Sequence, residues 1–238
     1  MKYAAFALVL ALSCPAQAEP LKLLTEEYPP YNFSAGGQPS GASVEQAELI
    51  MKALGIKYAI EILPWARAFS LAESQPSTCV FTTGHDAERA QRFKWVMPLL
   101  VDRMVMLKKA GSSVKPLNID DAKRFTVGTQ REDFSSNYLK NNNFTKIDLA
   151  ADMEATLKKL LSERIDLMMT SEKTFETMRA EGRQVEAALV LDGKFYGFAC
   201  NLAVPDATIA AMQGELDTLI KDGVQDRIFQ KYGLRTNR

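Results

Sequence analysis

The sequence predicts an α/β fold of two lobes, and three patterns carry that prediction. Short apolar runs typical of strands alternate with amphipathic segments typical of helices. Helices separate the first three expected strands, which is the pattern of a mainly parallel sheet. Two extended segments, near residues 100 and 198, join two such β/α units. We therefore expect a cleft between two lobes.

The first unit reads β-α-β-α-β. One helical segment begins near Ser43, a residue suited to capping a helix, and ends at Gly55. A second helix opens at Pro64, because proline is favoured in a first turn. The expected elements are strands 21–25, 58–63 and 79–83 and helices 43–54 and 64–72.

The remainder gives the second unit and a closing pair of helices. Met153, Leu157, Leu160 and Leu161 share one helical face, which indicates an amphipathic helix. The strand expected at 195–204 is long enough to cross between domains. The other expected strands are 104–107, 126–129 and 165–170, and the helices are a short one from 120 or 121, then 134–140, 153–163, 172–181, 205–222 and 225–232.

The N-terminus has the pattern of a secretory signal peptide over residues 1–18. Lys2 precedes an apolar run that is too short to span a bilayer, and the small residues Ala16-Gln17-Ala18 fit a cleavage site. The alternative is an N-terminal core helix or a membrane anchor. Cleavage after Ala18 predicts a periplasmic protein, which disfavours cytosolic nucleotide enzymes and DNA-binding proteins.

Composition narrows the partners and the chemistry further. Lysine plus arginine and aspartate plus glutamate both number 29, without a basic stripe, so we expect no nucleic-acid partner. A single histidine, His85, gives little support to a histidine metal site or a Ser-His triad, and we expect neither metal nor cofactor. Cys79 and Cys200 remain after cleavage; they permit one disulfide or two buried free thiols.

Unusual polar and aromatic residues cluster where the expected strands end. Ligands of open α/β sheets bind beyond the carboxyl ends of the strands, so these residues are candidates for a binding site. They are Glu26 to Tyr31, Pro64 and Trp65, Thr82 to Gly84, Gln130 and Arg131, and Thr170 and Ser171.

The order of these motifs resembles the family-3 extracellular solute-binding proteins, the polar amino-acid receptors of ABC importers. The resemblance covers essentially all of the chain after residue 18. It rests on T-E-E-Y-P-P-Y-N-F at 25–33, P-W-A-R at 64–67, E-R-x3-F-x-W-x-x-P-L at 88–99, F-Y-G-F-A at 195–199 and a terminal motif at 222–233.

The resemblance implies a bilobed periplasmic-binding-protein fold with a two-strand hinge. Lobe one would hold residues 19–101 plus 199–238, and lobe two residues 102–198. It also implies a monomer that binds a small molecule and docks on the permease subunits of a membrane importer. In that fold the strand of Cys79 lies beside the returning strand of Cys200, so a disulfide would join them within lobe one.

The resemblance also implies roles for single residues. Arg89 matches the arginine that clamps the ligand carboxylate, a task that suits a guanidinium; the alternative is a surface arginine paired with Asp86 or Glu88. Tyr28 matches a stacking aromatic residue, and Trp65 either lines the cleft or caps the core of the lobe. The expected ligand-binding set is Tyr28, Trp65, Arg67, Thr82, Thr83, Arg89, Gln130 and Ser171.

One departure from the family pattern bears on the ligand. The acidic residue that holds the α-ammonium is absent near Thr170 and Ser171, and Glu172 lies one position out of register. We therefore expect a non-enzymatic receptor for a polar or anionic solute, either amino-acid-like or an organic acid. Two alternatives stay open: a ligand-sensing module, and a dehydratase or lyase like the cyclohexadienyl dehydratases, with its acid or base among Glu26, Glu27, Glu132 and Glu172.

Overall fold

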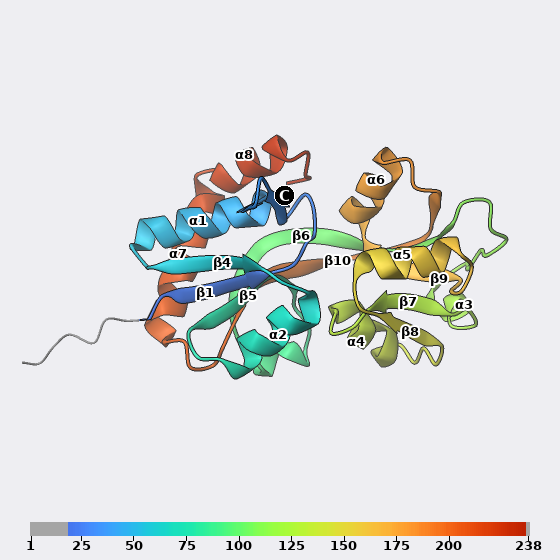
Figure 1. The fold of residues 1–238 in the computed structure, drawn as a ribbon, viewed down its shortest axis with the longest axis horizontal. Helices are drawn as coiled ribbons and strands as arrows, with labels where there is room; N and C mark the ends of the chain where they lie inside the picture. Colours follow the sequence, from blue (N-terminus) through green and yellow to red (C-terminus); the bar gives the residue numbers. More distant parts are fainter. Residues whose placement is uncertain (1–18, 237–238) are drawn as a thin grey trace, which may run out of the picture.

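The computed structural model describes residues 19–236, which form two α/β halves connected side by side (Figure 1). The predicted signal peptide, residues 1–18, lies outside the described residues. A sheet of eight strands runs through both halves in the order β4-β1-β5-β10-β6-β9-β7-β8. Within the described residues, no helix is both long and apolar enough to cross a membrane.

Lobe one is the half built on three parallel strands, with helices on both faces (Figure 1). Side chains alternate across a strand, so Leu23 faces one helix layer and Leu24 the other. The first layer includes α1 and α7, and the second is α2. The elements are β1 Leu21–Thr25, α1 Ala42–Leu54, β4 Tyr58–Ile62, α2 Trp65–Ser74, β5 Thr78–Gly84, α7 Asp206–Lys221 and α8 Val224–Lys231.

Lobe two repeats this arrangement around a second parallel set of strands. Met169 packs with Leu139 on one face, and Met168 packs with Leu157 and Leu160 on the other. The elements are α3 Ile119–Ala122, β7 Val127–Gln130, α4 Phe134–Asn141, β8 Ile147–Ala150, α5 Met153–Leu161, β9 Leu167–Ser171 and α6 Glu172–Ala180.

Two long antiparallel strands, β6 Lys94–Lys109 and β10 Val185–Cys200, pass through both lobes. The strand predicted at 195–204 is wrong at both ends: it begins ten residues earlier and stops at Cys200. Asn201 leaves the sheet because its side-chain nitrogen donates to the Ala72 and Glu73 carbonyls. The predicted lobe boundaries, at 101/102 and 198/199, fall within these two strands, and the division itself stays a prediction.

Other local differences from the prediction have simple causes. Helix α1 begins at Ala42 and its N-cap is Gly41, so the prediction of a Ser43 cap is wrong. Gly41 has a φ of 123°, and a Cβ there would meet the Tyr31 carbonyl oxygen at 2.3 Å. A small hairpin, β2 Phe33–Ala35 and β3 Gln38–Ser40, and the short strand β8 were not predicted.

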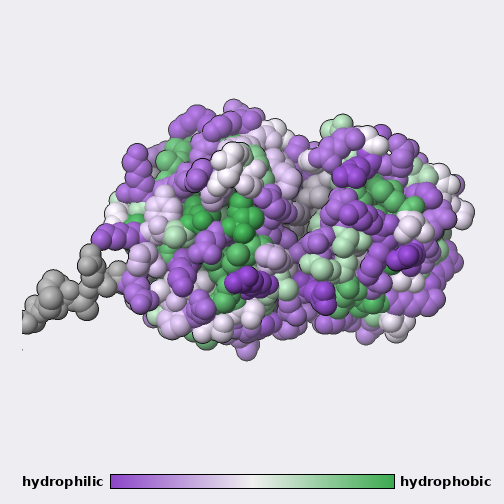
Figure 2. Space-filling view, viewed as in Figure 1, coloured by the Kyte–Doolittle hydropathy of each residue, from purple (hydrophilic) through white to green (hydrophobic). Residues whose placement is uncertain are grey.

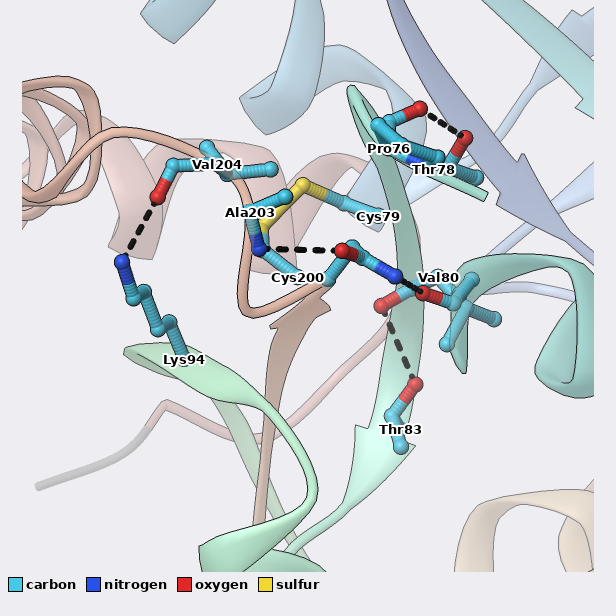
Figure 3. Close-up of a disulfide and its surroundings, with 11 residues drawn as sticks. Pro76, Thr78, Cys79, Val80, Thr83, Lys94, Cys200, Ala203 and Val204 are labelled. Atoms are coloured by element: carbon cyan, nitrogen blue, oxygen red, sulfur yellow. Dashed lines mark hydrogen bonds between the residues drawn. A yellow bond between two sulfur atoms is a disulfide. The ribbon is translucent and has the colours of Figure 1, made fainter. Parts of the chain in front are cut away.

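Cys79 and Cys200 form the disulfide, so the alternative of two free thiols is wrong. The two cysteines are register partners on β5 and β10, and both are fully buried (Figure 3). The bond ties the returning strand β10 to the first lobe.

Candidate functional site

A cleft of about 980 Å³ lies between the lobes, and both lobes line it. Figure 2 shows the groove between the two halves of the molecule. Lobe one contributes the loop after β1, the end of β4 and the start of α2. Lobe two contributes the end of β7, the start of α5, and α6. The lining residues used below are Glu26, Glu27, Tyr28, Glu61, Trp65, Gln130, Asp152, Glu154, Glu181 and Arg183.

Two side chains of lobe one donate to one backbone oxygen of lobe two. The Trp65 indole Nε1 donates to the Glu132 carbonyl at 2.7 Å, and Arg89 Nη2 donates to the same oxygen. Glu132 has a φ of 58°, in the left-handed region, and lies in the turn between β7 and α4. This carbonyl therefore connects the lobes in the described conformation.

A third connection joins two side chains inside the cleft. Gln130 Nε2 donates to a Glu26 carboxyl oxygen at 2.7 Å. Burial raises the pKa of Glu26 to about 8; the Gln130 hydrogen bond lowers it, and the negative charges of Asp133 and Asp152 raise it. At neutral pH the Glu26 carboxyl is therefore mostly protonated.

Tyr28 packs at the wall of the same cleft. Its ring stacks on Tyr31 with the centroids 5.4 Å apart. Burial raises the pKa of Tyr28, against hydrogen bonds to Ser171 and Thr174 of lobe two. Tyr28 thus lies where a ligand would contact it and also touches the opposite lobe.

Of the residues predicted to bind ligand, Tyr28, Trp65 and Gln130 line this cleft. Arg67 is exposed on α2, outside the lining. Thr83 is buried and donates to the Val80 carbonyl at 3.2 Å. The others lie nearby with their side chains buried, and their ligand roles stay predictions; they are Thr82, Arg89 and Ser171.

Arg89 lies on the short helix η1, Arg89–Gln91, and is 1% exposed. Its Nη1 donates to the Gly84 carbonyl at 3.1 Å, and its guanidinium carbon lies 4.8 Å from the Phe69 ring centre. The alternative, a surface arginine paired with Asp86, fits only in part: 3.7 Å separates Nε from the Asp86 carboxylate oxygen, and the side chain is buried. Nη1 and Nη2 thus donate to carbonyls of both lobes, whereas the buried Nε has no hydrogen-bond partner among the described residues.

Ser171 has a local structural role. Its hydroxyl accepts from the Thr174 backbone nitrogen at 3.2 Å and caps α6. The neighbouring Glu172 accepts from Arg103 at 2.6 Å and from Arg235 at 2.8 Å, outside the cleft lining. Of the four carboxyls considered for acid–base chemistry, Glu26 and Glu27 line the cleft, whereas Glu172 and Glu132 do not.

Sequence reasoning missed two features of this site. The Glu132 carbonyl is a backbone group, and no side-chain pattern marks it. Asp152 caps α5 by accepting from the Ala155 backbone nitrogen at 2.7 Å. Its position before an amphipathic helix was a readable signal, but the short strand β8 that places it at the cleft was not predicted.

A family profile matches nearly the whole described chain. Residues 21–235 match the bacterial extracellular solute-binding proteins, family 3. The chain belongs to this family. A search of curated protein sequences finds no significant match.

Several solved structures have the same fold as this family member. A histidine kinase sensor domain with similarity to periplasmic binding proteins is 18% identical, with a TM-score of 0.81 and coverage of 90% of this chain and 96% of that one. The arginine-, lysine-, histidine-binding protein ArtJ from Geobacillus stearothermophilus is 20% identical, with a TM-score of 0.79 and coverage of 90% and 95%. AncCDT-1, an ancestral amino-acid-binding protein and precursor of cyclohexadienyl dehydratase, is 19% identical, with a TM-score of 0.74 and coverage of 90% and 94%.

Proposed function

We propose that this family-3 protein is a periplasmic receptor that captures a small polar solute between its lobes and delivers it to the permease subunits of an ABC importer. The observation that carries the proposal is the cleft, because residues of both lobes line it. A ligand that contacts both lobes favours the closed arrangement over the open one, and closure is the signal that a membrane partner reads.

The hinge for this motion would be the pair of strands β6 and β10. Their pairing changes register between Tyr196 and Phe198, next to the predicted boundary of the lobes. Gly197 has no room for a side chain, since a Cβ would meet the Val96 carbonyl oxygen at 2.5 Å. The disulfide leaves this motion free because both of its cysteines lie in lobe one.

The charge of the residues that line the cleft favours a neutral or positively charged polar solute over an anionic one. Acidic side chains outnumber basic ones among the residues that line the cleft. Two relatives of this fold, ArtJ and an ancestral arginine-binding protein, bear names that state binding of basic amino acids. With identities of 20% and 22%, they support the solute class without identifying the solute.

A thermal-shift screen tests the proposal. The purified protein is heated with amino acids, amines, organic acids and sugars, and hits are confirmed by calorimetry. We expect at least one small solute to raise the melting temperature, because ligands stabilise the state that binds them. If no compound of any charge class binds, the proposal of a solute receptor is wrong.

A second candidate is a lyase on the same scaffold, and Glu26 is the observation that favours it. A carboxyl that stays protonated near neutral pH is suited to general acid catalysis. Turnover of prephenate or arogenate, lost on Glu26→Gln, would replace the receptor proposal. A sensing role shares the fold, and adjacent genes for a kinase rather than a permease would favour it.

A further inference from the structure

Negative charge dominates the cleft. Six carboxyl groups and one cation, Arg183, line it, and Glu26 is the carboxyl that is mostly protonated at neutral pH. Arg183 forms ion pairs with two of these carboxylates: Nη2 lies 3.4 Å from a Glu154 oxygen, and Nε lies 3.6 Å from a Glu181 oxygen. Within residues 19–236, no ion pair engages the remaining four, which are Glu26, Glu27, Glu61 and Asp152. A site of this charge attracts a positively charged solute and repels an anion.

A buried acceptor in the same cleft points to a hydrogen-bond donor. Gln130 is 1% exposed and lines the cleft, and its side-chain oxygen has no hydrogen-bond partner among the described residues. A buried polar atom without a partner is costly, so its presence at a binding surface indicates a group that a ligand satisfies. The Gln130 nitrogen already holds Glu26, which sets the acceptor beside that carboxyl.

The aromatic residues of the cleft suit the same class of ligand. Tyr28 and Trp65 both line it, and aromatic faces attract cations. The group that would hold a ligand carboxylate is absent from the lining, since Arg89 is buried and donates to the Gly84 and Glu132 carbonyls. A carboxylate on the solute therefore has no preformed partner here.

We propose, on the basis of the receptor function above, that the cleft binds an organic cation, an amine or a guanidinium compound, whose charged group donates to the Glu26 carboxylate and to the Gln130 side-chain oxygen.

Binding is then coupled to a proton. In the described conformation, with the lobes in contact, Glu26 is a neutral acid, because burial raises its pKa and the carboxylates of Asp133 and Asp152 oppose its ionisation. Burial lowers the pKa of Arg89, the buried cation of this region, and the carboxylates of Asp133 and Asp86 oppose that shift. When the cation binds, the Glu26 O–H bond breaks, the carboxylate pairs with the ligand and the proton passes to solvent.

Titration calorimetry with agmatine, which carries a guanidinium and an amine but no carboxylate, tests this proposal. The measurement is repeated in phosphate and in Tris near neutral pH, since the difference in heat counts the protons released. We expect close to one proton per bound agmatine, and an affinity that rises about tenfold per pH unit between about pH 6 and pH 7.5. Arginine should bind no more tightly than agmatine.

Two variants supply the matched comparison. Glu26→Gln should weaken agmatine binding by more than about tenfold and abolish proton release. Glu48→Gln removes an exposed carboxylate on α1, outside the cleft lining, and should change both values little. If Glu26→Gln does not fold, the proton count of the unaltered protein decides alone.

The failures are distinguishable. Binding of glutarate or of a neutral sugar, with no binding of agmatine or putrescine, overturns the cation assignment and leaves the receptor function standing. Binding of agmatine without proton release overturns the Glu26 contact. Absence of binding by every class of solute overturns both proposals.

Discussion

Gly84 offers a direct way to hold the cleft open. It ends β5 in lobe one, and a Cβ added there would meet the Phe134 ring at 2.5 Å and 2.7 Å. Phe134 begins α4 in lobe two and is 7% exposed. Its ring packs edge-on against Tyr196, with the centroids 5.6 Å apart, so it has little room to retreat. Gly84→Ala should therefore separate the lobes.

The loss of closure free energy in Gly84→Ala follows from the hydrogen bonds that separation of the lobes breaks. Trp65 and Arg89 each donate to the Glu132 carbonyl, and Gln130 donates to Glu26. At a net contribution of about 0.5–1.5 kcal/mol per hydrogen bond, closure loses about 1.5–4.5 kcal/mol. Affinity for a ligand that needs the closed form should fall about tenfold to a thousandfold.

Two measurements check this prediction. Small-angle X-ray scattering should give a larger radius of gyration for Gly84→Ala than for the unaltered protein, and calorimetry should give the weaker affinity. Gly214→Ala is the matched control, because a Cβ at that position on α7 meets nothing within 4 Å. If Gly84→Ala keeps the scattering profile and the affinity of the control, the inferred contact between the lobes does not govern closure.

Three further predictions concern other parts of the molecule. Glu26 has a pKa of about 8 in the fold against an ordinary 4.5, so its contribution to stability is full below about pH 4.5 and is lost as pH rises through about 8. The shift corresponds to at most about 5 kcal/mol of unfolding free energy, and to a few kcal/mol because the residue keeps partial exposure. Urea unfolding of Glu26→Gln should therefore show a flatter dependence of the unfolding free energy on pH. An unchanged pH profile would contradict it. Replacing Cys79 and Cys200 by serine opens a loop with a sequence separation of 121, which should cost up to about 5 kcal/mol of unfolding free energy in the chain-entropy model, while ligand affinity stays nearly constant. Trp65→Phe removes one of the two tryptophans and the hydrogen bond from the indole to the Glu132 carbonyl, so it should abolish most of the ligand-induced change in tryptophan fluorescence. If the fluorescence change survives in this variant, the signal comes from Trp95.

The strands and helices of lobe one were predictable because the spacing of apolar residues and the glycine and proline residues at the ends of elements indicate the same boundaries there. Leu23 and Leu24 face two separate helix layers, and Gly55 closes α1 in the left-handed conformation that glycine favours. The first half of β10 was missed because most of its side chains are exposed or half-buried, so it lacks a buried apolar run.

The candidate site was predictable only in part, for a physical reason. Ligands of open α/β sheets bind beyond the strand ends, and Tyr28, Trp65 and Gln130, chosen on that basis, line the cleft, while their ligand roles stay predictions. The partner of a side chain depends on the other lobe, which no local pattern specifies. Arg89 was expected to face a ligand, yet it donates to the carbonyls of Gly84 and Glu132.

The protonation of Glu26 links these observations. Glu26 ionises readily in water and poorly in the closed cleft, where Gln130 is its hydrogen-bond donor and Asp133 and Asp152 add negative potential. Raising the pH above about 8 therefore favours separation of the lobes, because an open cleft hydrates the carboxylate. A bound cation neutralises the same carboxylate without opening the cleft. Alkaline pH and a bound cation thus both ionise Glu26 but have opposite effects on closure, so scattering at high pH should give an open profile without agmatine and a closed profile with it.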